Sequence, residues 1–383
     1  MKKILHFISG PYLPMSQNWI YWQIVNLEGY EPVVYCYRTE NLDLFSLNTV
    51  RSLEVKYHCN FLSVIIDKLI RRLPVLFLFA LLRDKPDIIH AHFGNSGFRA
   101  LILKKFSNLP LVTTFYGFDL SCLPEKSPRW KSRFLKLFRQ GDFFVVEGAC
   151  MRRRLIALGC PEGKILIHRI GVDLDKIKFL PRKIGEDRQI KILISARFCE
   201  KKGIPFALKA FALVRKENLG VNLMLTIIGD ANKNSSSDCY EKRKIIGLVK
   251  EHSLEGNVRF LGFKKYSEFL QELYNHHIFL SPSITAVNGD AEGGAPVSII
   301  EASASGMPVI STLHCDIPEI ILNGKSGYLV PEQDIESLKD KLNYLIHNHN
   351  EWVKMGLEGR RHIEKYYNIV NNVKKIKELY DQF

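Results

Sequence analysis

Short apolar runs alternate with amphipathic stretches along most of the chain, as strands and helices do when they follow one another. The first half carries a series of apolar runs that we predict as buried strands, at 3–8, 32–36, 87–90, 111–115, 142–146 and 164–168. A second series follows at 190–195, 222–228, 258–261, 277–281, 308–311 and 328–330. Helical patterns lie between the runs, among them 17–27 and 64–82. Strands that alternate with helices favour parallel sheets, so the two series indicate two α/β units.

The length of the chain, 383 residues, exceeds what one hydrophobic core usually organises and also favours two domains. The stretch 173–188 is charged, includes a proline and a glycine and has no clear period, so we interpret it as the interdomain linker. A first domain is then expected over residues 1–172 and a second over residues 189–365. Residues 366–383 are predicted to form an amphipathic helix, because apolar residues recur every third position at Val370, Val373, Ile376 and Leu379.

Composition and charge narrow the range of partners. The hydrophobic fraction of 46% and the charged fraction of 25% are those of an ordinary globular protein. A formal net charge of +14 fits an anionic small molecule, an anionic membrane surface or nucleic acid. The basic residues are spread over the chain and form no recognisable nucleic-acid-binding module, so a nucleic-acid partner is not expected.

The cysteines and apolar runs bear on the cellular compartment. The eight cysteines are scattered and form no C-x-x-C pair, which is typical of reduced cysteines in the cytoplasm. The apolar run 73–82 is far shorter than the roughly 20 residues that a membrane-spanning helix needs. Residues 1–8 read as a strand and not as a signal peptide. We therefore expect a cytoplasmic protein, either soluble or peripheral on the inner face of the plasma membrane.

The segment 292–301 carries two glutamates around a glycine-rich turn. A helix is expected to begin near Pro296, which suits a first turn, and to end at Gly306. Glu292 then lies on a loop at the N-terminal end of this helix, and Glu301 lies in its second turn. Carboxylates accept hydrogen bonds strongly from hydroxyl groups such as those of a sugar or a ribose.

The turn between the glutamates, Gly293, Gly294 and Ala295 with Pro296, brings backbone amide groups to the start of the helix. Such amides are suited to an anion, for example a diphosphate. The alternative is a purely structural turn in which Glu292 acts as a capping carboxylate.

Two cations follow the first strand of the second series. Arg197 stands two residues after that strand, and Lys202 precedes a glycine. Fixed cations stabilise the negative charge that develops when a nucleoside diphosphate departs. The alternative is that Lys201 and Lys202 are a solvated pair at the start of a helix.

In the first half, chemistry-bearing residues again follow strands. Gly10 lies on the loop after the first run, where Ser16 is a candidate helix N-cap. This loop has no G-x-G-x-x-G pattern, which weighs against a dinucleotide-dependent dehydrogenase. His90 and His92 share one face of a strand; a zinc site needs further ligands, and the sequence offers no spaced set, so no metal is expected. We expect one of these histidines to be buried and hydrogen-bonded, with His92 the better candidate for contact with a sugar or an acceptor.

The paired glutamates and the segment 195–203 resemble glycosyltransferase family 4, retaining enzymes of the GT-B fold, and within it the bacterial exopolysaccharide and colanic-acid-type enzymes. The family usually has seven residues between the glutamates, whereas this chain has eight. The resemblance implies two Rossmann-like domains with parallel sheets that face a central cleft, with the C-terminal helix returning to the first domain. It also implies that Glu301 holds the nucleotide ribose and Glu292 the hydroxyls of the transferred sugar, while Arg197 and Lys202 face the donor diphosphate.

The resemblance extends to other turns. It implies that Gly229 with Asp230 and Gly262 with Phe263 flank the nucleotide base, and that the loop carrying Gly10 and Ser16 lies against the diphosphate and the acceptor. Ordinary strand-to-helix turns are the alternative for the first two pairs.

The segment 113–119 is similar to a family segment that often reads Phe-His-Gly-x-Asp. Tyr116 occupies the usual histidine position, which leaves Asp119 as the retained polar group. Asp173 and Asp175 match the family's Gly-Val-Asp turn better than a metal motif, so they change nothing in the expectation of a metal-free site.

The segment 129–139 is basic and aromatic. It is compatible with a helix that lies on an anionic membrane and equally with a half-buried helix that has a solvated basic face.

The resemblance implies a retaining transfer of a hexose-type sugar from a nucleoside-diphosphate donor to a saccharide or lipid-linked hydroxyl, in surface polysaccharide synthesis. The nucleotide sugar is a co-substrate, and no metal or other cofactor is expected. A nucleotide-sugar epimerase or hydrolase of the same architecture is one alternative, and a non-catalytic saccharide-binding protein is another.

Overall fold

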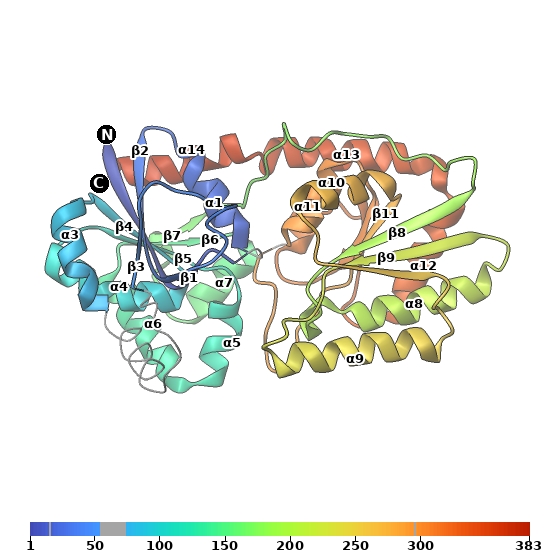
Figure 1. Cartoon of the computed structure of the whole chain (residues 1–383), viewed down its shortest axis with the longest axis horizontal. Helices are drawn as coiled ribbons and strands as arrows, with labels where there is room; N and C mark the ends of the chain where they lie inside the picture. Colours follow the sequence, from blue (N-terminus) through green and yellow to red (C-terminus); the bar gives the residue numbers. More distant parts are fainter. Residues whose placement is uncertain (15–16, 54–73, 295) are drawn as a thin grey trace. The chain divides into compact units, whose positions relative to one another are not determined.

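The computed structural model describes residues 1–14, 17–53, 74–294 and 296–383 (Figure 1). The chain divides into two compact units, of which the first comprises Met1–Gly171 and Ile369–Phe383 and the second Val172–Asn368. Residues 173–188, expected to be a linker, therefore lie within the second unit. Ile177 contributes to the core there, and the buried Arg182 donates hydrogen bonds to a backbone carbonyl and a serine hydroxyl of that unit.

The sheet of the first unit is parallel, with the strand order β3-β2-β1-β4-β5-β6-β7 (Figure 1). Its strands are β1 (Lys2–Tyr12), β2 (Tyr30–Thr39), β3 (Val50–Ser52), β4 (Ile88–His92), β5 (Leu111–Thr114), β6 (Phe143–Val146) and β7 (Ile165–Ile167). The predicted strands of this half are confirmed, whereas β3 was not predicted. It is a short strand at the edge of the sheet, with the sequence Val-Arg-Ser, and none of its residues is fully buried. Such a strand needs no run of apolar residues, so the sequence pattern did not predict it.

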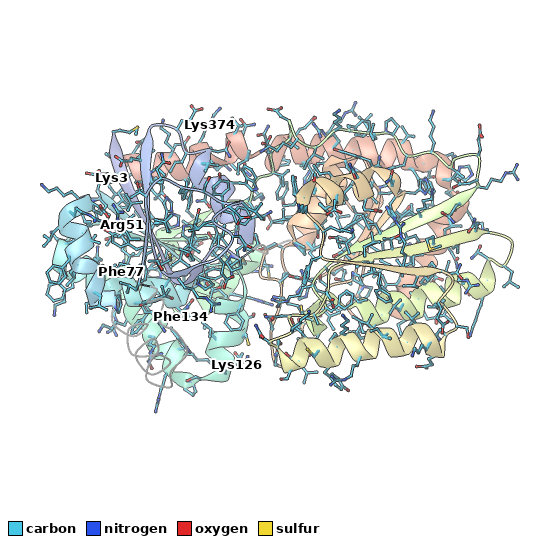
Figure 2. All side chains as sticks on the ribbon, viewed as in Figure 1. Lys3, Arg51, Phe77, Lys126, Phe134 and Lys374 are labelled. Atoms are coloured by element: carbon cyan, nitrogen blue, oxygen red, sulfur yellow. The ribbon has the colours of Figure 1, made fainter. Side chains whose placement is uncertain are left out.

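Alternate strand residues of this sheet face two different cores. Leu5 and Ile89 belong to the core that the helices α4 and α6 complete, while Ile4 and Ile88 belong to the core that α14 completes. Phe77 and Phe134, both labelled in Figure 2, are buried in the first of these cores. The helices of the unit are α1 (Asn18–Val25), α3 (Leu78–Asp84), α4 (Gly94–Ser107), α5 (Phe118–Lys126), α6 (Pro128–Gln140), α7 (Ala149–Ala157) and α14 (Ile369–Asp381), with 3₁₀ turns at Pro74–Phe77 and Glu162–Lys164.

The C-terminal helix α14 belongs to the first unit, as the sequence predicted. Val373, Ile376 and Leu379, three of the residues that recur every third position, are buried in its core. Of the predicted helix 64–82, residues 64–73 lie outside the described part of the chain, and the rest forms the turn 74–77 and the start of α3.

The second unit has a parallel sheet with the order β10-β9-β8-β11-β12-β13 (Figure 1). Its strands are β8 (Gln189–Ser195), β9 (Asn222–Ile228), β10 (Val258–Gly262), β11 (Ile278–Ser281), β12 (Val309–Thr312) and β13 (Gly327–Val330), all of them predicted. Its helices are α8 (Ile204–Glu217), α9 (Ser236–Glu251), α10 (Tyr266–Asn275), α11 (Val297–Ala304), α12 (Ile335–His347) and α13 (Trp352–Tyr366), with 3₁₀ turns at Glu200–Lys202, Ile317–Glu319 and His349–Glu351. Ile192 and Ile194 pack on the side of α8 and α12, whereas Leu193 packs on the side of α11 and α13. Both units are thus Rossmann-like, with helices on both faces of a parallel sheet.

Candidate functional site

The candidate residues of the second unit lie at or after the carboxyl ends of β8, β9, β10 and β11, and Glu301 lies on the helix α11 that follows the last of these loops. In open α/β sheets this is the edge where ligands bind, because the loops there converge and helix N-termini face the same space. The geometry of these loops decides which of the predicted residues meet.

Lys202 and Glu292 form a buried ion pair. The Nζ of Lys202 lies 2.7 Å from Oε1 of Glu292, whose side chain is 7% exposed. The hydroxyl of Ser283 donates a hydrogen bond of 2.9 Å to the same carboxylate oxygen. Burial alone would raise the pKa of Glu292, but Lys202 and then Lys201 outweigh it and hold this pKa at about 2. Glu292 is therefore a fixed negative charge at any physiological pH.

Lys201 also belongs to this site, although the sequence favoured only Lys202. Its Nζ lies 3.2 Å from Oδ1 of Asp290 and donates to the carbonyl of Ala291 at 3.1 Å. Burial would lower the pKa of Lys201, but Glu292 and Asp290 raise it above its ordinary value. The two lysines thus hold the loop 290–292 through ion pairs and a hydrogen bond. They do not form the solvated pair that was the alternative.

His314, which was not predicted as a site residue, binds the backbone of the same loop. The amide of Glu292 donates to Nε2 of His314 at 3.1 Å, so the proton of the neutral ring is on Nδ1. That nitrogen donates to Oε1 of Glu332 at 2.6 Å, and Oε2 of Glu332 accepts the amide of Thr285 at 2.7 Å. His314 lies two residues after the end of β12, and its place after a predicted strand was the available signal.

Glu301 is carried by α11 as the sequence predicted. The helix comprises Val297–Ala304 after an N-cap at Pro296, and the chain leaves it at Gly306 with a φ of +93°. The side chain of Glu301 is buried, and burial raises its pKa to about 8, an effect that a hydrogen bond with the hydroxyl of Tyr266 partly offsets. Glu301 is thus mostly protonated at neutral pH in the free protein. Tyr266, at the start of α10, was not predicted as a site residue.

The glycine-rich turn leaves amide groups available at the start of α11. Gly293 has a φ of +81°, a conformation that favours glycine. Within the described residues, the amides of Gly293 and Gly294 donate to no protein acceptor. Ala295 lies outside the described residues. Free amides beside a helix N-terminus are suited to an anion, as expected for this turn.

Arg197 is half-exposed and held by a carboxylate at the start of α9. Its Nε lies 3.3 Å from Oδ2 of Asp238, and its side chain is 41% exposed. Burial would lower its pKa, but Cys199 and Asp238 raise it above the ordinary value. The guanidinium therefore stays charged and keeps a solvent-facing side.

The predicted base-flanking turns contact each other. The amide of Gly229 donates to the carbonyl of Gly262 at 2.8 Å, and both glycines have positive φ angles. The carboxylate of Asp230 forms an ion pair with Lys242, whose Nζ lies 2.6 Å away. Phe263 is 67% exposed, which leaves an aromatic face available for stacking.

In the first unit, His90 and His92 are joined by a third histidine that the sequence analysis did not find. His6 of β1 pairs in register with His90 of β4, and ligand nitrogens of the three rings all lie within 4.8 Å of one another. However, the rings of His90 and His92 are stacked at 15° and those of His6 and His92 at 23°. A nitrogen lone pair lies in the plane of its ring, so nearly parallel rings do not direct their lone pairs to one metal.

Most nitrogens of these histidines also have partners within the protein, whereas the buried Nε2 of His6 has no hydrogen-bond partner among the described residues. Nδ1 of His92 lies 2.7 Å from the hydroxyl of Tyr116, and its Nε2 lies 3.0 Å from Nδ1 of His6. His90 bonds to Tyr380 of α14 and, at 2.6 Å, to Thr114. Burial lowers the pKa of each ring, so all three are neutral. Both His90 and His92 are fully buried, whereas His92 was expected to reach a ligand; His6 and Tyr116 bond to its two ring nitrogens.

Asp119 is fully buried as well, and its carboxylate organises the local backbone. It accepts the amide of Gly94 at the start of α4 at 2.7 Å, and those of Tyr116 and Gly117 at 3.1 and 3.0 Å. Burial raises its pKa to about 6 against these hydrogen bonds. The structure thus gives Asp119 the geometry of a positioning residue. Gly10 lies within β1, and Ser16 lies outside the described residues.

The basic segment 129–139 forms most of α6 and is half-buried. Phe134, Leu137 and Phe138 pack in the core of the first unit, while the arginines and lysines lie on the other side of the helix. Within the described part of the chain, no helix is both long enough and apolar enough to cross a membrane.

Comparison with known proteins agrees with this architecture. Residues 176–362 match the family model of glycosyl transferases group 1, and residues 26–176 match that of glycosyltransferase family 4. The chain belongs to these glycosyltransferases. It is 34% identical over 261 residues to the Escherichia coli protein named colanic acid biosynthesis glycosyltransferase WcaL, in an alignment that covers 67% of this chain and 61% of that protein. It is 33% identical to the amylovoran biosynthesis glycosyltransferase AmsK of Erwinia amylovora, over 74% of this chain and 67% of AmsK.

The chain thus spans about three fifths of the length of its colanic-acid relative. Among solved structures, Anabaena Alr3699/HepE in complex with UDP and glucose superposes with a TM-score of 0.80 at 17% identity, covering all of both chains. Sucrose-phosphate synthase from Thermosynechococcus elongatus gives the same TM-score and identity over 100% of this chain and 99% of its own. At this identity the likeness shows the fold, which is GT-B.

Within the second unit, some of the residues predicted on separate motifs contact one another. Lys202 contacts Glu292, and the turns at Gly229 and Gly262 contact each other. The main additions are the groups that hold the glutamates in place: Lys201, Ser283, Tyr266, His314 and Glu332.

Proposed function

We propose that this chain is a retaining glycosyltransferase that moves a hexose-type sugar from a nucleoside-diphosphate donor to a saccharide or lipid-linked hydroxyl in surface polysaccharide synthesis. The observation that carries the proposal is the Lys202–Glu292 ion pair beside the free amides of Gly293 and Gly294. A cation, a carboxylate and the start of a helix together match the needs of a nucleotide sugar: a diphosphate to be neutralised and hydroxyls to be accepted.

The roles follow from the charges. Glu292 stays ionised because the lysines hold its pKa at about 2, so it accepts sugar hydroxyls without losing its charge to a proton. Lys202, Arg197 and the helix amides stabilise the diphosphate as it leaves. Glu301 contacts the ribose hydroxyls, to which its neutral carboxyl group offers both a donor and an acceptor. Phe263 offers its exposed ring to the base. Lys202, Arg197 and the helix amides supply the positive charge that the departing diphosphate needs, so we include no metal in the proposal.

In the transfer, the bond between the anomeric carbon and the diphosphate oxygen breaks. A bond from the same carbon to the acceptor oxygen forms on the same face of the ring, and the acceptor proton passes to the leaving phosphate. Each anionic oxygen that develops lies near fixed positive groups, which lowers the barrier without a covalent intermediate.

Relatives support the substrate class. WcaL and AmsK carry names of polysaccharide biosynthesis, and HepE binds UDP-glucose. An Escherichia coli relative, 24% identical over 94% of this chain, is named as a galactosyltransferase from UDP-Gal to a diphosphoundecaprenol-linked sugar. We accordingly propose a cytoplasmic enzyme that meets lipid-linked acceptors at the membrane surface.

The test uses the purified full chain with labelled nucleotide sugars, with and without acceptors. Transfer that requires an acceptor and gives a product of the donor's anomeric configuration by NMR supports the proposal. Complete turnover of the donor without an acceptor identifies an epimerase or hydrolase. Nucleotide binding without transfer to any saccharide or lipid-linked acceptor of a broad panel identifies a binding protein.

A further inference from the structure

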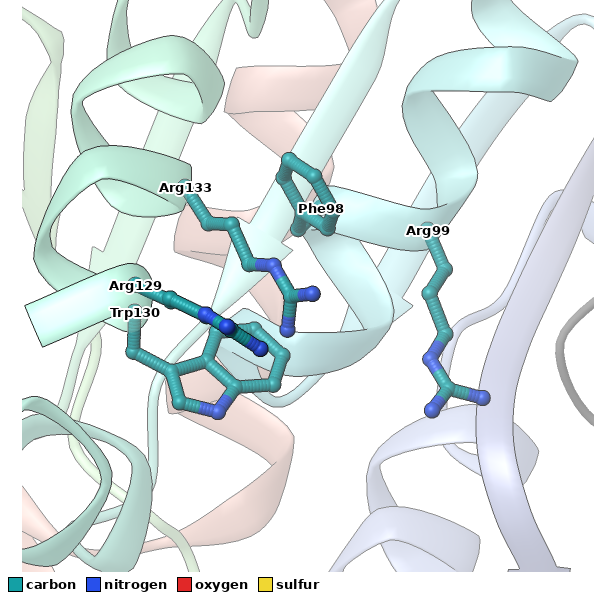
Figure 3. A pocket seen from close by; sticks show the side chains of 5 residues that line it. All are labelled: Phe98, Arg99, Arg129, Trp130 and Arg133. Atoms are coloured by element: carbon teal, nitrogen blue, oxygen red, sulfur yellow. The ribbon is translucent and has the colours of Figure 1, made fainter. Parts of the chain in front are cut away.

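A pocket lined by arginines and aromatic rings lies between α4 and α6 in the first unit (Figure 3). It encloses about 530 Å³, and its lining residues are Phe98, Arg99, Arg129, Trp130 and Arg133. That volume is typical of a small-molecule site. None of the described residues that line it is acidic.

Among the described residues, two aromatic rings and no carboxylate hold Arg133. Its guanidinium carbon lies 4.7 Å from the ring centroid of Trp130 and 5.4 Å from that of Phe98, and Figure 3 shows the side chain extending between the two rings. Stacking uses the face of a guanidinium and leaves the N–H donors in its plane free to grip an anion bidentately. Among the residues that the structure describes, neither Arg129 nor Arg133 forms an ion pair.

The other arginine of the pocket comes from the neighbouring helix. Arg99 projects from α4 on the opposite side of the pocket in Figure 3, and its guanidinium carbon lies 5.7 Å from the ring centroid of Tyr37. Aromatic rings therefore orient guanidinium groups on both sides of the hollow.

The arginines stand where a helix normally prefers acids. Arg129 lies in the first turn of α6 and Arg133 in the second, and neither α6 nor α4 has an acidic residue in its first turn. The N-terminal end of a helix carries partial positive charge, so cations placed there repel it. An anion bound in the pocket compensates both the arginines and the helix end.

We propose that this pocket binds the phosphate group of an organic phosphate, with the arginines as donors and Trp130 as a platform for the part of the ligand next to the phosphate. A phosphate or diphosphate has more oxygens and more charge than a carboxylate, and it matches several guanidinium groups at once. A soluble sugar phosphate and a phospholipid headgroup share this chemistry. The site is built from the first unit alone, so the proposal does not rest on the transferase reaction of the second.

The indole N–H of Trp130 reports on the pocket directly. In the ¹⁵N-labelled full chain, its NMR signal is identified by its loss in Trp130→Phe, because the chain has only four tryptophans. Inorganic pyrophosphate is titrated at constant ionic strength, followed by phosphatidylglycerol vesicles and phosphatidylcholine vesicles at matched phosphate. Arg133→Ala removes the stacked cation and Arg133→Lys keeps the charge without the fork. Lys136→Ala removes one charge from an exposed position of the same helix outside the pocket.

The proposal expects a saturable shift of the Trp130 signal in the unmodified chain. The affinity should fall by about tenfold or more in Arg133→Ala, less in Arg133→Lys, and stay within about twofold in Lys136→Ala. A shift with pyrophosphate but not with anionic vesicles identifies a soluble phosphate, and a shift with phosphatidylglycerol but not phosphatidylcholine identifies a headgroup. No saturable shift with either probe, or equal losses in Arg133→Ala and Lys136→Ala, overturns the proposal, because the arginines are then an ordinary solvated surface.

Discussion

The protonation of Glu301 gives a prediction whose sign and size follow from the structure. Burial raises the pKa of this side chain from 4.5 to about 8. Between these values the folded protein keeps a proton that the unfolded chain has lost, so the free energy of unfolding falls as pH rises through this range. One pH unit corresponds to about 1.4 kcal/mol, which gives an upper limit of about 3 kcal/mol between pH 4.5 and pH 7.

Glu301→Gln keeps the shape of the side chain and removes the titration. The variant should match the unmodified chain in stability near pH 4.5 and exceed it by up to about 3 kcal/mol at pH 7 and about 4 kcal/mol at pH 8. Urea unfolding followed by circular dichroism at several pH values from 4.5 to 8 measures the difference. If Glu301→Gln keeps the full pH dependence, or is less stable at pH 8, then Glu301 is not the buried neutral acid described above.

Glu292→Gln is the matched control, since its expected effect has the opposite sign. The pKa of Glu292 is held at about 2, so its carboxylate stabilises the fold above pH 4.5, and that contribution is lost as pH falls toward 2. The substitution leaves Lys202 buried without its partner and should lower stability at pH 7 by up to about 3 kcal/mol. Equal shifts in both glutamine variants would contradict the assignment of the two charges.

Three further predictions concern the same unit. Lys202→Ala should lower kcat/KM of sugar transfer by about 10²–10³-fold, or about 3–4 kcal/mol, in steady-state assays, because it removes the cation that we propose faces the leaving diphosphate. Near-normal turnover contradicts that role. His314→Ala should lower kcat with little change in nucleotide affinity by calorimetry, because it removes the acceptor of the Glu292 amide. His314→Gln should recover part of the lost kcat, since an amide side chain both donates and accepts hydrogen bonds. An equal loss of kcat in both variants argues for a structural role alone. Gly229→Ala should destabilise the protein by about 2 kcal/mol or more in urea, because its Cβ would lie 2.0 Å from the carbonyl of Ala196 at a φ of +120°, and an unchanged midpoint would mean that the turn adapts freely.

The parts of the fold that the sequence predicted are those with a strong local pattern. The long buried strands are continuous apolar runs, and α11 has a proline at its start and a glycine after its end, so its bounds could be read directly. Strand β3 could not be predicted, because three residues at a sheet edge have no period of their own. The stretch 173–188 looks like a linker in composition, and only tertiary contacts such as those of Arg182 assign it to the second unit.

The site was predictable in its residue types but not in its contacts. Lys202 and Glu292 lie on loops after different strands, and their ion pair follows from the order of strands in the sheet. The pairing of β1 with β4 brings His6 beside His90 and His92, which the spacing within one strand cannot reveal. The sequence did not identify His314 as a site residue, because single polar residues after strands are common. Only its hydrogen bond with the Glu292 amide shows its place in the site.

The most direct test of the central claim is a transfer assay that compares the unmodified chain with Lys202→Ala. The nucleoside diphosphate that raises the Tm most in a thermal-shift screen selects the donor, because a ligand that binds the folded state stabilises it. The labelled nucleotide sugar is then supplied with a panel of saccharide and lipid-linked acceptors. We predict that labelled sugar joins an acceptor with release of the nucleoside diphosphate, and that Lys202→Ala loses about 10²–10³-fold of this rate. Donor turnover that is independent of acceptors, or transfer that is unaffected in Lys202→Ala, would contradict the account.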